Sequence, residues 1–247
     1  MADPLRLVLT CEHAGCEVPD DYRELFRPHA PLLLTHRGYD IGILPFAQKL
    51  AVELHEPLLA ASMTRLLVDL NRSLRHPQLF SFITRSLPRP DRQKILDNYY
   101  HPHRQQVVQA IEKYIDRGER VLHIALHSFT PMYKGVLRRG DICLLYDPSR
   151  AAEKKLCLQW QLLLNNRLPE VCVRRNFPYR GNADALVTWL RLCYPASSYL
   201  GLELEINQRL PLLNSRDWVE AQDQLILSIK EILSSDQLPG RGKGLLP

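Results

Sequence analysis

Residues 5–15 read Leu-Arg-Leu-Val-Leu-Thr-Cys-Glu-His-Ala-Gly, an apolar run of strand length followed at once by ionisable residues. A short apolar run of this kind is typical of a strand inside a sheet. We predict a strand over Leu5–Cys11, with Glu12 and His13 at its carboxyl end. Similar segments recur along the chain.

Outward from this segment, apolar runs of strand length alternate with longer segments of helical period, the pattern of an α/β sheet with parallel members. Further strands are predicted at 57–61, 66–70, 121–126, 141–146, 171–175 and 199–206. Helices are predicted at 41–54, at 92–117 with a bend or break at Pro102, at 149–168, in a short segment ending at Leu192, and at 216–233. Residues 73–90 have mixed polarity and are predicted to form a loop.

The chain shows no internal repeat and no convincing linker, so we predict one α/β domain over residues 1–239. Its central sheet should be mixed, largely parallel and flanked by helices. Residues 240–247 are Gly-rich and basic, and we expect them to form a mobile tail.

The composition is that of an ordinary globular protein, with 45% hydrophobic and 24% charged residues. No run approaches the roughly 18 apolar residues that cross a bilayer, and the N-terminus lacks the regions of a signal peptide. The six cysteines form no C-x-x-C pair, as expected of reduced structural thiols. We therefore expect a cytoplasmic protein with no membrane partner.

The net charge of +5 is modest for this length, and the basic residues are scattered. The densest cluster, Arg85–Arg92, is broken by Pro88 and Pro90. A nucleic-acid binder usually concentrates its charge in a patch with interleaved aromatic residues. We therefore expect no nucleic-acid partner, and we interpret the charge as aiding solubility and attracting an anionic substrate.

Four predicted strands end in ionisable or amide groups. These endings are Glu12-His13, Asp69-Leu70-Asn71-Arg72, His127-Ser128 and Glu205-Ile206-Asn207. Burying such groups is costly unless they are paired, bound to metal or used in chemistry. Because open α/β sheets bind ligands outside the carboxyl ends of their strands, we expect a site there.

His13 and His127 are the natural metal ligands of this set. Neutral imidazole suits zinc, and a catalytic zinc usually keeps three protein ligands and an open position for water. A carboxylate commonly completes the set, and Asp40 is the best candidate. Glu12 and Glu17 lie nearer to His13 in the sequence and remain alternatives.

Glu205 is a candidate general base, which would take a proton from metal-bound water and pass it to the leaving amine. Glu203, two residues earlier, shares the same face of the strand. One of the two would support the other or pair with an arginine.

Asn71 and Arg72 have the chemistry to bind a substrate carboxylate, because a guanidinium fork forms two hydrogen bonds and an amide adds a donor. Asp69 would orient Arg72. A later Pro/Gly/Asn loop carries Tyr179 and Arg180, which are further candidates for substrate contact.

At these residues the sequence resembles the N-formylglutamate amidohydrolase family. The matching segments, in order, are CEHAG with Pro19, HRGYDIG (36–42), RLLVDLNRS (65–73), NYY (98–100), HSFTP (127–131), DICLLYDP (141–148), RRNFPY (174–179) and ELEINQ (203–208). No single tetrapeptide is decisive, but the ordered set is specific and covers most of the chain.

The resemblance implies a zinc-dependent amide hydrolase with a fold like that of the zinc exopeptidases and aspartoacylases. It places the family's metal motifs on His13 and His127, its late Glu-Ile motif on Glu205, and a carboxylate-binding segment on 69–72. The wider metallopeptidase pattern has a Glu three residues after the first His, where this chain has Cys16. We therefore favour Asp40 as the third ligand.

Our hypothesis is a zinc-dependent hydrolase of the amide bond in a small N-acyl amino acid such as N-formyl-L-glutamate. One alternative is a metallocarboxypeptidase or peptide amidase, which would need a longer cleft. Another is a catalytically silent member that binds a ligand. The sequence does not reveal the oligomeric state.

Overall fold

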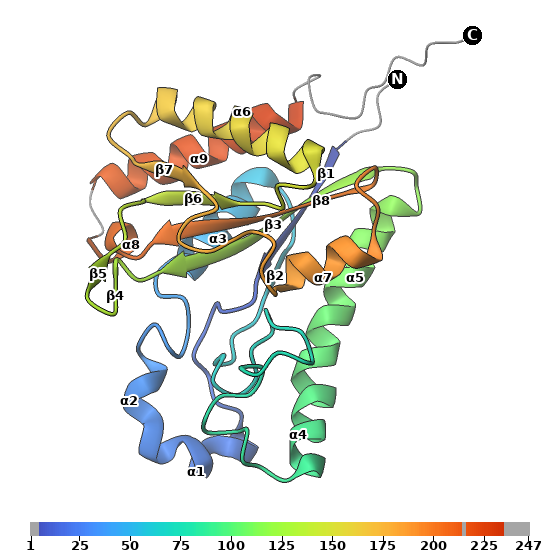
Figure 1. Cartoon of the computed structure of the whole chain (residues 1–247), viewed down its shortest axis with the longest axis vertical. Helices are drawn as coiled ribbons and strands as arrows, with labels where there is room; N and C mark the ends of the chain where they lie inside the picture. Colours follow the sequence, from blue (N-terminus) through green and yellow to red (C-terminus); the bar gives the residue numbers. More distant parts are fainter. Residues whose placement is uncertain (1–4, 214–215, 235–247) are drawn as a thin grey trace.

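The computed structural model describes residues 5–213 and 216–234 and shows a central sheet with helices on both faces (Figure 1). The strands are β1 (Leu5–Cys11), β2 (Leu58–Ala60), β3 (Arg120–Phe129), β4 (Met132–Tyr133), β5 (Val136–Leu137), β6 (Ile142–Leu145), β7 (Val173–Arg175) and β8 (Tyr199–Asn207). Six of them form the central sheet in the order β2-β1-β3-β8-β6-β7, and β4 pairs with β5 in a separate hairpin. Neighbouring strands of the central sheet run parallel except β6 and β8, so the predicted mixed, largely parallel sheet is confirmed.

The helices are α1 (Arg23–Phe26), α2 (Ala30–Leu33), α3 (Ile43–Leu54), α4 (Arg89–Ile95), α5 (His101–Ile115), α6 (Ala151–Arg167), α7 (Leu186–Cys193), α8 (Arg209–Leu213) and α9 (Arg216–Ser234). The apolar sides of α3, α6 and α9 pack on one face of the sheet, and those of α5 and α7 pack on the other. A parallel sheet buried on both faces needs this double cover. None of the helices described here combines the length and hydropathy that crossing a bilayer requires.

The predicted helix over 92–117 is confirmed with an interruption. A π-helical turn, Leu96–Tyr100, separates α4 from α5, and Pro102 lies in the first turn of α5. The backbone stays helical at Ile95, Tyr100 and His101, so the helix continues through this turn and Pro102 lies inside it. Proline has no N–H to donate, and a π-helical turn is one of the usual interruptions of the hydrogen-bond ladder of a helix.

The alternation of side chains along each strand positions the polar groups. On β3, Leu122, Ile124 and Leu126 belong to the core under α3, α6 and α9. His123 and His127 therefore point to the opposite face, which α5 and α7 partly cover. By the same alternation, Glu203 and Glu205 of β8 share that face with His127, which lies directly opposite Glu205 in the register.

A second lobe lies below the sheet in Figure 1 and contains α1, α2, α4 and the loops between them. It has an apolar cluster of its own, made of Tyr22, Phe26, Met63, Leu66, Leu67, Val68, Leu70, Leu79, Ile83, Ile95 and Tyr100. This lobe closes over the carboxyl ends of β1 and β3, where the predicted site lies.

The strand predicted over Leu66–Leu70 is wrong. Its backbone forms turns: Leu67 N donates to Thr64 O (3.0 Å) and Asp69 N donates to Leu79 O (2.8 Å). The run is apolar because it fills the core of the second lobe. A short apolar run has no period that distinguishes a strand from a buried turn. The other six predicted strands correspond to β1, β2, β3, β6, β7 and β8. Strand β3 runs on to Phe129 and β8 to Asn207, so His127 and Ser128 lie within β3 and not after it. The predicted tail, residues 240–247, lies outside the described residues.

Candidate metal centre

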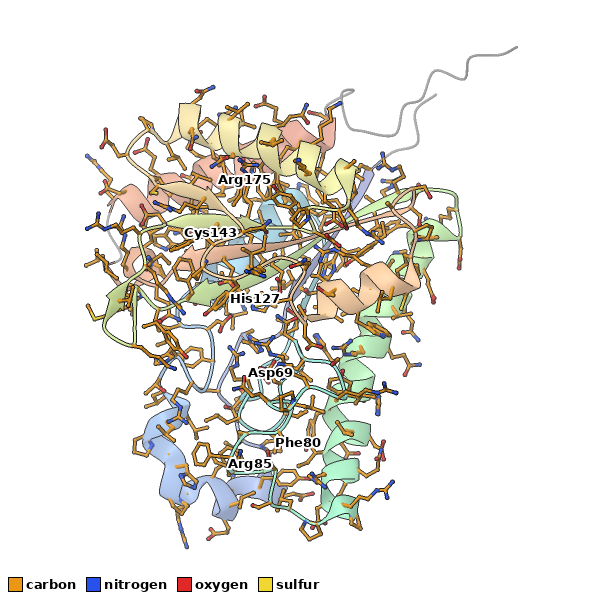
Figure 2. The ribbon with its side chains drawn as sticks, viewed as in Figure 1. Asp69, Phe80, Arg85, His127, Cys143 and Arg175 are labelled. Atoms are coloured by element: carbon orange, nitrogen blue, oxygen red, sulfur yellow. The ribbon has the colours of Figure 1, made fainter. Side chains whose placement is uncertain are left out.

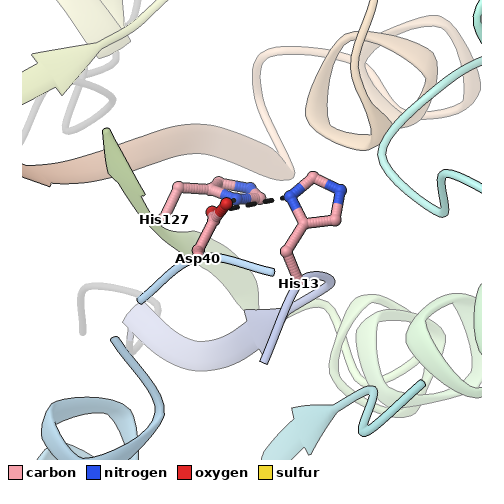
Figure 3. Close-up of side chains that lie close together, drawn as sticks. All are labelled: His13, Asp40 and His127. Carbon is pink, nitrogen blue, oxygen red and sulfur yellow. Dashed lines mark hydrogen bonds and ion pairs between the residues drawn. The ribbon is translucent and has the colours of Figure 1, made fainter. Parts of the chain in front are cut away.

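Three buried side chains from separate segments converge where β1 and β3 end. His13 follows β1, His127 lies near the end of β3, and Asp40 lies in the loop before α3. Asp40 N donates to His13 O (2.9 Å), a backbone hydrogen bond that ties the two loops together. Figure 3 shows both imidazoles directed at the Asp40 carboxylate.

Both histidines present the same nitrogen to this carboxylate. His127 Nδ1 lies 3.0 Å from Asp40 Oδ2, and His13 Nδ1 lies 3.5 Å from the same oxygen. One ligand atom from each of the three residues lies within 4.8 Å of the other two. His13 Nδ1 is buried and makes no hydrogen bond. Two imidazoles, one carboxylate and an unsatisfied buried donor atom fit a zinc ion that keeps an open position.

A second carboxylate lies beside Nε2 of each imidazole, the outer nitrogen, which points away from Asp40. His13 Nε2 lies 2.7 Å from Asp69 Oδ1, and His127 Nε2 lies 3.1 Å from Glu12 Oε2. Metal-binding histidines commonly carry such a partner on the second nitrogen, which sets the tautomer and the ring orientation. Both Nδ1 atoms are thereby left facing the space beside Asp40.

Arg65 completes this arrangement, and we did not single it out from the sequence. Its guanidinium reaches Asp69 Oδ2 (2.7 Å) and Asp40 Oδ1 (3.3 Å), so it neutralises part of the negative charge. The spacing of Arg65 and Asp69 was visible in the sequence, but the orientation of both depends on the turn that replaced the predicted strand.

The charges of the cluster shift its pKa values strongly. Burial opposes ionisation of Asp40, yet His13 and His127 outweigh it and hold the pKa of this carboxyl well below its usual range. Burial likewise opposes the charged form of His127, but hydrogen bonds to Asp40 and Glu12 raise its pKa well above the usual value.

Glu205 behaves differently from these groups. Burial raises its pKa to about 8, with His127 opposing the shift and Asp40 and Glu203 adding to it. Its Oε2 is buried without a hydrogen bond, whereas Glu203 accepts one from Asn71 Nδ2 (3.1 Å). Of the two glutamates considered, Glu205 is therefore the freer carboxyl.

All eight predicted site residues line a single cavity of about 660 Å³. They are His13, Asp40, Asn71, Arg72, His127, Tyr179, Arg180 and Glu205. The cavity is also lined by Asp69, Phe80 and Arg85, and Figure 2 shows these three below His127, toward the second lobe. Asn71 and Arg72 follow a segment that forms turns and not the predicted strand. They still line the same cavity as His127 and Glu205.

The four predicted substrate-binding residues differ in how free they are. The Asn71 amide is fully engaged, with Glu203 and His127 near Nδ2 and Leu186 N donating to Oδ1 (2.7 Å). Arg72 donates to Asp184 O and lies 4.0 Å from Asp69, a distant contact compared with that of Arg65. Tyr179 is 44% exposed and its hydroxyl accepts a hydrogen bond from Arg138 Nη1 (3.1 Å), whereas Arg180 is exposed.

The other carboxylates considered as ligands have separate positions. Glu17 accepts a hydrogen bond from Ser62 Oγ (2.7 Å) and does not line the cavity. Glu12 is fully buried against the outer nitrogen of His127, away from Asp40. Among the described residues, Asp40 is the carboxylate grouped with both imidazoles.

Comparisons with known proteins give a consistent result. A family model for N-formylglutamate amidohydrolase matches residues 5–212. A solved structure of a gene product from Agrobacterium tumefaciens is 26% identical, with a TM-score of 0.75 over 92% of this chain and 91% of that chain. The structure of an N-formylglutamate amidohydrolase from Ralstonia eutropha JMP134 is 21% identical, with a TM-score of 0.68 over 94% of each chain. No curated protein matches the sequence.

Proposed function

The chain belongs to the N-formylglutamate amidohydrolase family, and from that premise we propose that it is a zinc-dependent hydrolase of small N-acyl amino acids such as N-formyl-L-glutamate. Membership of this family supports an amidohydrolase, an enzyme that hydrolyses an amide C–N bond. The observation that carries the finer proposal is the group His13, Asp40 and His127 on the wall of the cavity.

In this proposal His13, Asp40 and His127 hold the metal, with Asp69 and Glu12 orienting the two imidazoles. When bound, zinc supplies a Lewis acid for the amide carbonyl and an acidified water as nucleophile. Arg65 keeps Asp40 and Asp69 ionised and in place.

Glu205 is the proposed general base and acid. Its carboxylate takes a proton from the attacking water and returns it to the leaving amine. A group does this best when its pKa lies near the working pH, and burial brings that of Glu205 to about 8. Its unbonded Oε2 is available for the transfer.

Arg72, Tyr179 and Arg180 are proposed to bind the substrate carboxylate, since all three line the cavity with the metal group. Asn71 stays a predicted contact, although its amide is already bonded to Glu203 and Leu186. A free substrate contact by Asn71 would require one of these bonds to exchange.

Metal analysis and kinetics of variants test the proposal. We expect one zinc per chain, and we expect His13→Ala and His127→Ala to lose both the metal and the activity on N-formyl-L-glutamate. Glu205→Gln should keep the zinc but lower kcat by about 10²–10⁴-fold. A protein without stoichiometric metal, fully active in both histidine variants, would refute the zinc mechanism.

A substrate screen distinguishes the proposed function from the two alternatives, a peptidase or peptide amidase and a ligand-binding member. Formyl-, acetyl- and peptidyl-glutamate are compared under the same conditions. Hydrolysis of peptides but not of N-formyl-L-glutamate would favour a peptidase or peptide amidase. Metal without hydrolysis of any of them would favour a ligand-binding member.

A further inference from the structure

The cavity continues well beyond the metal centre. Its lining also includes His36, Arg37, Phe80, Phe82 and Arg85, which we call the outer arm. In Figure 2 Asp69 lies below His127, and Phe80 and Arg85 lie farther along the same axis, toward the second lobe. Phe80 and Arg85 of the outer arm therefore lie away from His127, toward the second lobe.

The two arginines of the outer arm lack a carboxylate partner. Neither Arg37 nor Arg85 forms an ion pair with an acidic side chain of residues 5–213 or 216–234. The acidic residues that line the cavity are Asp40, Asp69, Asp184, Glu203 and Glu205. Of these, Asp40 and Asp69 already pair with Arg65, and Asp184 accepts from Ser73 N (2.9 Å).

The histidine beside them reports the local potential. Burial lowers the pKa of His36, and Arg37, Arg65 and Arg138 lower it further, while Asp40 opposes them. Three arginines and one carboxylate therefore act on His36, and the arginines outweigh Asp40.

The outer arm also offers apolar surface. Phe82 is partly exposed and lies under the Arg37 guanidinium, 5.3 Å from its ring centre, while Phe80 borders the same space. Guanidinium groups over aromatic rings form a surface for a carboxylate carried on a short aliphatic stem.

The size of the cavity exceeds the need of a single amino acid. Cavities of roughly 300–1,000 Å³ hold drug-sized ligands, and this one measures about 660 Å³. A formylated amino acid would occupy the metal centre and leave the outer arm empty.

We propose that Arg37 and Arg85 bind the side-chain carboxylate of a second acidic residue, so that N-acyl acidic dipeptides are preferred over single N-acyl amino acids. This inference rests on the proposed function for the reaction itself, but the binding it predicts can be measured without turnover.

Calorimetry on the Glu205→Gln protein as purified tests the inference with N-formyl-Glu-Glu and N-formyl-Glu-Ala. These ligands differ only in the second side chain. We expect the diglutamate to bind about tenfold more tightly, because it gains a charge-assisted pair. In Arg37→Gln/Arg85→Gln protein the two ligands should bind within about twofold of each other. Arg75→Gln, an exposed arginine that does not line the cavity, is the matched control and should keep the preference.

Equal affinity for the two dipeptides, or a preference that survives the double substitution, would overturn the inference. Hydrolysis of N-formyl-L-glutamate by the wild-type protein is assayed in parallel. Turnover of N-formyl-L-glutamate without a dipeptide preference would support the proposed function and refute the role of the outer arm. A dipeptide preference that depends on the two arginines, without turnover of any amide, would support the role of the outer arm and refute the proposed function.

Discussion

Two buried groups of charged side chains in this protein have opposite hydrogen-bonding character. Glu153 of α6 and Arg191 of α7 form a closed pair, with Arg191 Nη2 3.0 Å from Glu153 Oε2. Gly201 N and Asp147 N also donate to Glu153, and Arg191 donates to the carbonyls of Gly181 and Gly201. Each polar atom of this pair has a partner within the protein.

The metal centre is buried to a similar degree but is left unsatisfied. Nδ1 of His13 and Oε2 of Glu205 make no hydrogen bond to a described residue. Buried polar atoms are nearly always bonded, and leaving them unbonded costs stability. The difference indicates that the first group stabilises the fold, whereas the second has the unbonded donor atoms that the proposed metal site would use.

The largest effect should come from opening the closed pair. Arg191→Met leaves Glu153 charged and buried without its partner, and we expect a loss of about 3–5 kcal/mol in the free energy of unfolding, measured in urea. The double variant Glu153→Leu/Arg191→Met removes both charges and should recover much of that loss. A change below about 1 kcal/mol in the single variant would contradict a stabilising role.

His123 extends the comparison to pH. Its ring lies in the core with Thr10 Oγ1 at 2.9 Å and Tyr199 OH at 2.7 Å, and burial lowers its pKa from 6.5 to about 4. Below pH 6.5 the His123 imidazole binds a proton in the unfolded chain but stays neutral in the folded protein. The free energy of unfolding therefore falls as the pH drops toward 4. The contribution is about 3 kcal/mol over this window.

Unfolding of wild-type protein and His123→Gln is compared at pH 7 and pH 4.5. The variant should lose less stability between these values than the wild type does. Identical pH slopes for the two proteins would show that His123 does not titrate as a buried, neutral ring.

The carboxylates behind the imidazoles should affect the metal more than the fold. We expect Asp69→Asn and Glu12→Gln each to lower zinc affinity by about 10–100-fold, measured by competition with a chelating dye. Glu17→Gln is the control, since Glu17 bonds to Ser62 outside the cavity. Unchanged zinc affinity in both Asp69→Asn and Glu12→Gln would contradict the proposal that these carboxylates orient the imidazoles.

The smallest effect is expected at an exposed pair. Arg167 reaches Glu231 at 2.7 Å on the surface between α6 and α9. Because water screens exposed pairs, Glu231→Gln should change the free energy of unfolding by less than about 1 kcal/mol. A loss as large as that of Arg191→Met would erase the distinction between closed and exposed pairs.

Much of the fold was predictable because periodicity reflects burial. The runs containing β1, β3 and β8 are apolar since each strand is covered on both faces, and this pattern is local. The segment 66–70 has the same composition for another reason, as the core of a second lobe, and no local pattern separates the two cases.

The sequence by itself determined which segments carry His13, His127 and Glu205 to the same end of the sheet, since parallel strands bring their carboxyl ends together. Tertiary structure alone decided which carboxylate faces the imidazoles. Asp40 joins them because its loop hydrogen-bonds to the backbone of His13, while Glu12, next to His13 in the chain, turns to the far side of His127. Distance along the chain does not order carboxylates around a site; the direction in which each loop leaves the sheet does.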